Sequence, residues 1–310
     1  MRIGNAPCSW GVLEFESSTG AASAAQVLDE ISATGYEGTE LGDWGFLPTS
    51  ADALSAELDA RRLDLIGAFV PVALTNADAH ENGAAAAVRT ARLLAGVAQL
   101  ADAAPVGPRS GPMPFIVLAD ETVHGSMRAQ RAGRITTTDS LPPDAWTIVG
   151  RGADRIAGAV RDATGLRTVF HHHCATWVET PWEIEALLAR TDPSLVGLCL
   201  DTGHITYAGG NALDLLNRYG DRVWHVHFKD CDPAVARRAR EEGWDYQTAL
   251  RHGLFCELGR GMVDFASVRN RLESFGYAGW IVVEQDVLPS MGTPAESARR
   301  NRGYLKSIGL

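Results

Sequence analysis

The amino-acid sequence predicts a single (β/α)₈ TIM barrel, a closed ring of eight parallel strands with a helix after each. Its 310 residues are the usual size of one such barrel with modest insertions. Short apolar runs alternate with amphipathic stretches, which is the pattern of a parallel sheet with crossover helices. Polar residues follow directly after several apolar runs, at the end of the strands where such barrels place their functional groups.

Eight apolar runs have the length of strands, and the stretches that follow them have a helical period. The predicted strands are residues 2–5, 38–41, 64–69, 115–118, 168–171, 197–201, 223–228 and 280–284. The predicted helices are residues 22–34, 50–62, 83–101, 146–164, 182–190, 212–218, 263–275 and 294–307. Ser50 is a favourable N-cap for the second helix, and Thr180-Pro181 supplies a cap and a first-turn proline for the fifth.

Two segments depart from the alternating pattern. Residues 118–143 are polar and contain glycine, which predicts a long loop over the end of the fourth strand. Residues 232–258 are predicted to form an insertion after the seventh strand, with helical signals at 234–242 and 245–252. Because the sequence has no linker composition and no repeat beyond the βα unit, we expect one domain covering residues 1–310.

Charge and composition limit the kinds of partner that the protein can have. The net charge of −10 opposes non-specific attraction to nucleic acid or to an anionic membrane. No apolar run approaches the roughly 20 residues that span a bilayer, and the first residues do not resemble a signal peptide. Five cysteines without a CxxC pair favour reduced thiols and a cytoplasmic location. We expect a small-molecule substrate, and a homodimer remains open.

Histidines and carboxylates collect at the ends of the last four predicted strands, which meet at one mouth of a barrel. Six of the nine histidines lie within residues 171–227. Imidazole and carboxylate together suit Mn²⁺, Co²⁺, Fe²⁺ or Zn²⁺ better than Ca²⁺ or Mg²⁺. The candidate metal ligands are His171, His173, Asp201, His227 and Glu284.

Any one of these residues alone could cap a loop, but as a set they predict a metal site. Asp201 follows four mostly apolar residues, so its buried charge needs a cationic partner, and the same holds for Glu284. His225 and His227 lie two apart on one strand and share a face. We expect His227, nearer the mouth, to be the ligand and His225 to pack beside it.

At these residues the chain resembles the xylose-isomerase-like superfamily of sugar isomerases, epimerases and dehydratases. The similar stretches are 201–204 (DTGH), 223–230 (VWHVHFKD) and 282–286 (VVEQD). Three further stretches are similar to the inosose dehydratases of inositol catabolism: 5–11 (NAPCSWG), 171–180 (HHHCATWVET) and the insertion at 232–265.

The resemblance extends from the first predicted strand to the last and implies a set of ligands. The family's metal aspartate, histidine and last glutamate fall on Asp201, His227 and Glu284. The ligand of the fifth strand, usually glutamate in the epimerases, falls on His171, with His173 on the same face. This departure argues against the epimerase mechanism, in which two metal-bound glutamates exchange a proton, and agrees with a dehydratase.

The resemblance therefore implies a metal-dependent hydro-lyase that removes water from a 2-ketocyclitol such as scyllo-inosose through an enediolate. One divalent metal, Mn²⁺ or Co²⁺ before Fe²⁺ or Zn²⁺, would act as Lewis acid. Candidates for the proton transfers are His204, Glu284 and one of the histidines of the fifth strand, and Lys229 could hold the enolate or a hydroxyl group. Candidates for substrate binding are Asn5, Trp10, Glu40 and Glu179.

Three other functions are weighed against this one. A metal-dependent ketose or sugar isomerase or epimerase is the main alternative, because the same metal could move a proton without loss of water. A DNA-repair endonuclease of the same barrel class would need a basic face and histidines on the second and third strands, which the sequence lacks. An inactive binding or scaffold protein would be expected to have lost metal ligands, and the set is intact.

Overall fold

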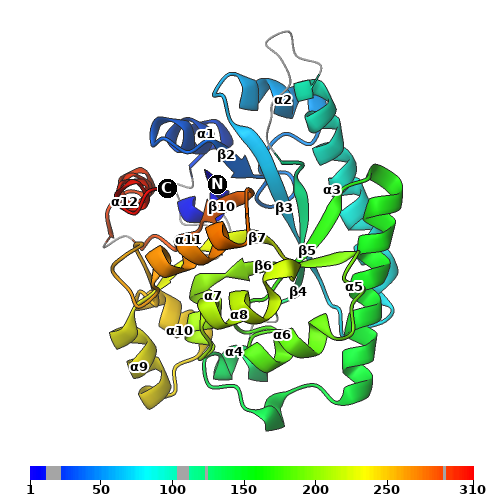
Figure 1. Cartoon of the computed structure of the whole chain (residues 1–310), viewed down its shortest axis with the longest axis vertical. Coiled ribbons are helices and arrows are strands. Elements are labelled where there is room, and N and C mark those ends of the chain that lie inside the picture. The colour runs from blue at the N-terminus through cyan, green and yellow to red at the C-terminus, as the bar shows by residue number, and fades with distance from the viewer. Residues whose placement is uncertain (12–21, 103–111, 123–124, 289–290) are drawn as a thin grey trace.

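The computed structural model describes residues 1–11, 22–102, 112–122, 125–288 and 291–310. Eight parallel strands close into a barrel in the order β1-β10-β7-β6-β5-β4-β3-β2. Helices surround the ring of strands (Figure 1). The predicted single (β/α)₈ TIM barrel is confirmed.

The barrel strands lie where the sequence predicts them. They are β1 (Arg2–Asn5), β2 (Gly38–Glu40), β3 (Asp64–Val72), β4 (Phe115–Asp120), β5 (Arg167–His171), β6 (Val196–Asp201), β7 (Val223–Phe228) and β10 (Trp280–Val283). Two of them, β3 and β4, run longer than predicted, because their ladder continues in register from Gly67 and Phe115 to Val72 and Asp120.

The predicted helices are also present. They are α1 (Ala24–Ala33), α2 (Ala51–Asp59), α3 (Ala79–Asp102), α5 (Pro143–Thr164), α6 (Pro181–Leu188), α8 (Ala212–Tyr219), α11 (Phe265–Ser274) and α12 (Pro294–Ser307). Thr180 is the N-cap of α6 as predicted, and its amide donates to the Glu183 carboxylate. Ser50 occupies the N-cap position of α2, but its side chain makes no capping hydrogen bond.

Part of the predicted loop 118–143 is helical instead. It contains α4 (Met127–Arg131) and a 3₁₀ turn at Thr137–Asp139. The buried Arg128 fixes α4 against α6, because its guanidinium donates to both oxygens of Glu183 at 2.9 and 2.8 Å. A bidentate pair between distant segments leaves no periodic signal in the sequence, so the loop prediction was wrong here.

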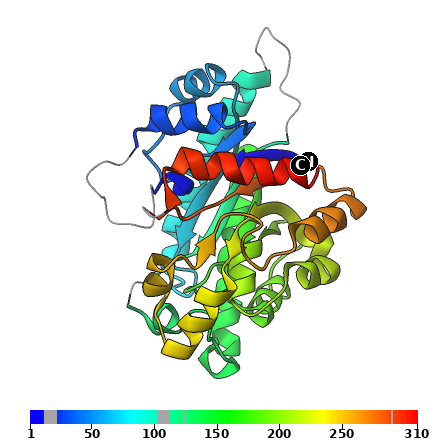
Figure 2. The same ribbon diagram turned by 90° about the vertical axis from the view of Figure 1, so that its left-hand side faces the viewer.

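The insertion after β7 has the two predicted helices, α9 (Pro233–Glu242) and α10 (Tyr246–Arg251). A two-stranded antiparallel sheet of β8 (Asp230–Cys231) and β9 (Phe255–Cys256) ties its ends together. In both views the insertion lies beside α4 at one end of the molecule (Figures 1 and 2). A further short helix, α7 (Thr202–Tyr207), follows β6 directly and was not predicted.

The main core lies between the strands and the surrounding helices, where side chains such as Leu28, Leu94 and Ile156 are fully buried. The barrel interior is narrow near β1 and β2. A Cβ atom on Gly4 would lie 2.1 Å from the end of the Ile66 side chain, which would have to move to make room. Among the helices that the structure describes, none is both long and apolar enough to cross a membrane.

Candidate active site

A cavity of about 200 Å³ opens at the carboxyl ends of the barrel strands, the usual place for the active site of this fold. Its described lining residues are Ala6, Pro7, Cys8, Glu40, Gly42, Phe69, Thr122, His171, His173, Lys229, Tyr246, Gln247 and Glu284. The insertion contributes Tyr246 and Gln247 from α10, so it forms part of the cavity wall.

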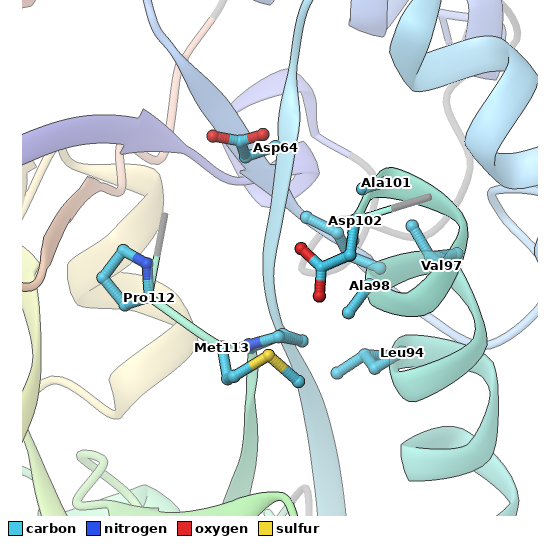
Figure 3. Close-up of a pocket in the computed structure, with 10 residues that line it drawn as sticks. Asp64, Leu94, Val97, Ala98, Ala101, Asp102, Pro112 and Met113 are labelled. Carbon is cyan, nitrogen blue, oxygen red and sulfur yellow. The ribbon is translucent and has the colours of Figure 1, made fainter. Parts of the chain in front are cut away.

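A second cavity lies at the opposite end of the barrel, where β3 and β4 begin (Figure 3). Asp64, Met113 and apolar residues of α3 line it, and its volume is only about 50 Å³. The amino end of a barrel serves stability more than chemistry, and the described residues that line this cavity include no histidine. The functional groups are therefore at the carboxyl end.

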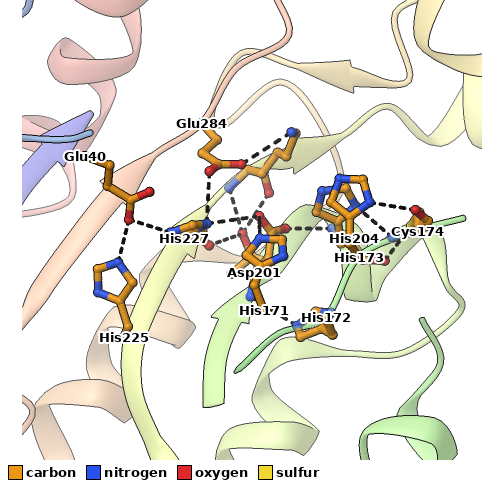
Figure 4. Close-up of polar contacts among 12 residues, drawn as sticks. Glu40, His171, His172, His173, Cys174, Asp201, His204, His225, His227 and Glu284 are labelled. Carbon is orange, nitrogen blue, oxygen red and sulfur yellow. Dashed lines mark hydrogen bonds and ion pairs between the residues drawn. The ribbon is translucent and has the colours of Figure 1, made fainter. Parts of the chain in front are cut away.

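Four of the five predicted metal ligands meet there. Donor atoms of His171, Asp201, His227 and Glu284 all lie within 4.8 Å of one another (Figure 4). The Asp201 Oδ2 atom is 3.7 Å from His171 Nε2 and 4.0 Å from His227 Nδ1. His227 Nδ1 is also 3.1 Å from Glu284 Oε1. These residues lie within one residue of the carboxyl ends of β5, β6, β7 and β10, which are consecutive in the ring.

The surroundings of Asp201 indicate that this group fits a cation. Its Oδ1 accepts a hydrogen bond of 2.7 Å from the His204 amide, whereas the buried Oδ2 has no hydrogen-bond partner among the described residues. A buried carboxylate oxygen without a partner is costly unless a positive charge faces it. Two imidazole nitrogens with two carboxylate oxygens form a donor set that suits a divalent transition metal.

The protonation states of the four side chains follow from their burial and from one another's charges. Burial alone would raise the pKa of Asp201 and of Glu284, but the neighbouring histidines lower both, so the two carboxylates are ionised. Burial lowers the pKa of His171, which keeps its ring neutral. Burial would also lower the pKa of His227, but the neighbouring Cys199 and the carboxylates of Glu284 and Glu40 raise it well above its usual value, so without an ion this ring carries a proton on both nitrogens, and a bound ion would displace the one on Nδ1.

Glu40 lies at the end of β2 and reaches across the barrel to β7. Its Oε1 atom is 2.8 Å from His225 Nε2 and 3.0 Å from His227 Nε2 (Figure 4). Burial alone would raise the pKa of Glu40, but the two histidines lower it to about 2, so Glu40 is a carboxylate. The predicted substrate contact Glu40 thus lines the cavity and also contacts His227 from the side opposite the ligand group.

His173 was also predicted to bind the metal. It lines the cavity, but it does not belong to the group of donor atoms that lie within 4.8 Å of one another. The ring of His173 is 5.7 Å from that of His171 and 3.9 Å from that of His204. His173 Nδ1 lies 2.6 Å from the carbonyl oxygen of Cys174. A carbonyl only accepts, so Nδ1 carries the proton, and the neutral ring has its lone pair on Nε2.

Lys229 is buried directly after β7 and also lines the cavity. Its ammonium nitrogen is 3.6 Å from Glu284 Oε2, 3.2 Å from Asp286 Oδ2 and 4.6 Å from the centre of the Phe255 ring. A cation is therefore held beside the ligand group, with hydrogen-bond donors available to a substrate oxygen.

The remaining predicted substrate contacts lie elsewhere, since the described cavity-lining residues do not include Asn5, Trp10 or Glu179. Asn5 is buried at the end of β1, with its Oδ1 accepting from the Ala6 amide, and Trp10 donates to Glu30 at 2.6 Å. The carboxylate of Glu179 accepts from the amides of Gly133 and Ala175 at 2.6 and 2.8 Å.

Glu179 therefore anchors the loop that contains His173. Ala175 in this loop has a φ of 69°, a left-handed conformation that costs energy for alanine, and its amide donates to Glu179. Burial raises the pKa of the Glu179 carboxyl to about 7. Within the stretch 171–180, Glu179 thus has a structural role, whereas His171 and His173 face the cavity.

Sequence reasoning did not single out Tyr246 and Gln247 as cavity residues, nor Cys199, whose sulfur lies within 4.8 Å of donor atoms of His171 and His227. Tyr246 and Gln247 could have been found from the position of the insertion, because a segment directly after the seventh strand lies at the mouth of the barrel. Burial raises the pKa of the Cys199 thiol to about 12, so it stays protonated and is a poor ligand.

The fold and this site define a known class of protein. Residues 28–308 match the family described as xylose isomerase-like TIM barrel, and the chain belongs to that family. It is also similar over almost its whole length to inosose dehydratases. Identity is 30% to that of Lacticaseibacillus casei, over 98% of this chain and 96% of that protein. Identity to the inosose dehydratase of Lactiplantibacillus plantarum is 32%, over 99% of this chain and 95% of that protein.

This similarity confirms the predicted family resemblance, and the protein is an enzyme of the hydro-lyase class. Solved structures confirm the fold. A 3-keto-D-glucoside 4-epimerase from E. coli superposes with a TM-score of 0.68 at 17% identity, over 99% of both chains. A probable 3-DHS dehydratase from Bacillus anthracis gives 0.68 at 14% identity, again over 99% of both.

Proposed function

We propose that the protein is a metal-dependent dehydratase that removes water from a 2-ketocyclitol, with scyllo-inosose as the first candidate. The observation behind this proposal is the buried group of His171, Asp201, His227 and Glu284 beside a cavity of about 200 Å³. The relatives named inosose dehydratase supply the class of substrate. A cavity of this size suits a ring with several hydroxyl groups.

These four residues would hold one divalent metal, with Mn²⁺ or Co²⁺ preferred over Fe²⁺ or Zn²⁺. When bound, the metal supplies a Lewis acid that stabilises negative charge on the substrate's carbonyl oxygen. Asp201 and Glu284 would offset the charge of the ion, and His171 and His227 would bind it through ring nitrogens, His227 after losing the proton on Nδ1. The ligands come from four different strands, so the barrel framework fixes their relative positions.

His173 is the residue that takes the proton from the carbon next to the carbonyl group. It lies in the cavity wall next to His171, and its hydrogen bond to Cys174 leaves the lone pair on Nε2. Loss of this proton gives an enediolate. Lys229 donates a proton to the hydroxyl group on the following carbon, the C–O bond breaks, and water leaves. The organic product is a diketone in its enol form.

The test is a metal-dependent assay on the purified protein. After removal of metal with a chelator, Mn²⁺, Co²⁺, Fe²⁺ or Zn²⁺ is added back, and inososes and ketohexoses are offered in turn. We expect a diketone absorbance with an inosose only when a metal is present. A new sugar without this absorbance would instead assign an isomerase or epimerase. Activity that survives complete metal removal would refute the proposal.

Three substitutions test the ligand group directly. Asp201→Ala, His227→Ala and Glu284→Gln should each abolish turnover, because the metal loses one of its four ligands. Circular dichroism and thermal midpoints should remain near those of the wild-type protein. Near-normal turnover in any of the three would remove that residue from the ligand set.

A further inference from the structure

We propose that Glu40 is a positioning residue for the metal site, which holds His227 in the tautomer that presents Nδ1 to the ion. This inference rests on the ligand group proposed above. It gives Glu40 a role beyond substrate binding and extends the site to a strand that carries none of the four ligands.

The two ring nitrogens of His227 face different neighbours. His227 Nε2 lies 3.0 Å from Glu40 Oε1, within hydrogen-bond distance. A carboxylate oxygen can only accept, so Nε2 carries the proton. The other nitrogen, Nδ1, lies 3.1 Å from Glu284 Oε1 on the side of the ligand group, so when an ion displaces its proton the lone pair on Nδ1 faces that ion.

His225 holds Glu40 in place for this task. Its Nε2 atom lies 2.8 Å from the same Oε1 atom, so one carboxylate oxygen accepts from two rings on β7. All three side chains are buried, with at most 5% of each exposed. Such a pairing of carboxylate, histidine and metal fixes the orientation of the ring and makes it a stronger ligand.

The topology makes this contact informative. Strands β2 and β7 are not neighbours, because β1 and β10 lie between them in the ring. The interaction therefore crosses the barrel interior and does not follow from pairing of adjacent strands. Buried polar groups are kept where they serve a purpose, and the purpose that fits the Glu40 carboxylate is to orient His227 as a metal ligand.

A second ion between Glu40, His225 and His227 is the rival interpretation, because their donor atoms also lie within 4.8 Å of one another. The separations of 2.8 and 3.0 Å argue against it. Ligands around a tetrahedral ion with bonds of about 2.0–2.1 Å lie about 3.3 Å apart. The observed distances are those of hydrogen bonds.

The first experiment compares Co²⁺ binding by chelator-treated wild-type protein, Glu40→Gln and Glu257→Gln, using calorimetry and the visible spectrum of Co²⁺. Glu40→Gln keeps the side-chain shape but removes the charge. Glu257 is a matched control, because it is also 5% exposed but pairs with Arg300 at 2.6 Å. We expect one equivalent in wild type, affinity lower by about 10- to 100-fold in Glu40→Gln, and no change in Glu257→Gln.

Each other outcome overturns the inference in a recognisable way. Unchanged affinity and spectrum in Glu40→Gln would overturn the role of Glu40 alone, provided that His227→Ala weakens binding. Two equivalents in wild type that fall to one in Glu40→Gln would establish the second ion instead. Failure of the wild-type protein to bind any metal would overturn the proposed function together with this inference.

A second measurement needs no substitution. Nitrogen-15 NMR of the Zn²⁺-loaded wild-type protein, labelled at histidine, reports which ring nitrogen carries the proton. We expect His227 to be protonated at Nε2 and bound through Nδ1. A His227 ring protonated at Nδ1 would overturn the proposal even if Glu40→Gln failed to fold.

Discussion

The rings of His173 and His204 lie 3.9 Å apart, and the backbone of Cys174 holds them in opposite tautomers. The Cys174 carbonyl accepts from His173 Nδ1, whereas the Cys174 amide donates to His204 Nδ1 at 3.3 Å. Neutral His204 therefore carries its proton on Nε2, and burial lowers its pKa well below the usual value. Next to the ligand group the two rings therefore differ in which nitrogen carries the proton.

Substitution of His173 should separate proton transfer from metal binding. His173→Gln should lower kcat by roughly 100- to 10,000-fold, the usual effect of losing a general base. Metal affinity should stay close to that of wild type, because His173 is not among the residues that could hold the ion. Steady-state kinetics and calorimetry measure the two effects, and exchange of the substrate's α-hydrogen with solvent should be lost in parallel with kcat.

His252→Gln is the control for that experiment, because this histidine is exposed on the outer side of the insertion. It should leave both quantities unchanged. If His173→Gln instead lost the metal while Asp201 and His227 were intact, His173 would be a ligand, as the sequence alone predicted.

The buried ion pair between Arg128 and Glu183 should be a major source of stability. Arg128→Met leaves the Glu183 charge buried without its partner, which we expect to cost about 3–5 kcal/mol of unfolding free energy. Arg131→Met removes a similar pair with Asp139 in which the arginine is 45% exposed, and should cost less than about 1 kcal/mol. Urea unfolding measures both, and equal losses in the two variants would contradict this account.

Glu179 should make the stability depend on pH. Burial raises its pKa from 4.5 to about 7. The folded protein therefore keeps a proton that the unfolded chain releases, and its stability falls as the pH rises through this window, by about 3 kcal/mol. Glu179→Gln should flatten the curve of unfolding free energy between about pH 5 and pH 7. Parallel curves for the two proteins would show that Glu179 does not titrate in this window.

The sequence predicted the barrel because its signals are local. Alternating apolar runs define the strands, and residues at strand ends converge once the strands are parallel, so the convergence of His171, Asp201, His227 and Glu284 followed from their positions alone. Both helices of the insertion were recognisable from their period in the same way.

Other features depend on contacts between distant segments and were not predictable. Whether His173 binds metal or faces the substrate depends on the turn at Ala175 and the hydrogen bond to Cys174. The contact of Glu40 with His225 and His227 spans 185 and 187 residues of sequence. Helix α4 similarly depends on an arginine whose partner lies 55 residues further along the chain.

The four ligand strands β5, β6, β7 and β10 are consecutive in the ring, and β1 to β4 with the segments that follow them supply Pro7, Phe69, Thr122 and other residues of the opposite cavity wall. One half of the barrel would thus hold the ion and the groups that transfer protons, while the other half supplies the facing wall of the cavity. Over evolution, or in the laboratory, the second half can diversify and accept new ring shapes while the first preserves the reaction. Glu40 is the exception, because a change there would reach across and disturb both halves.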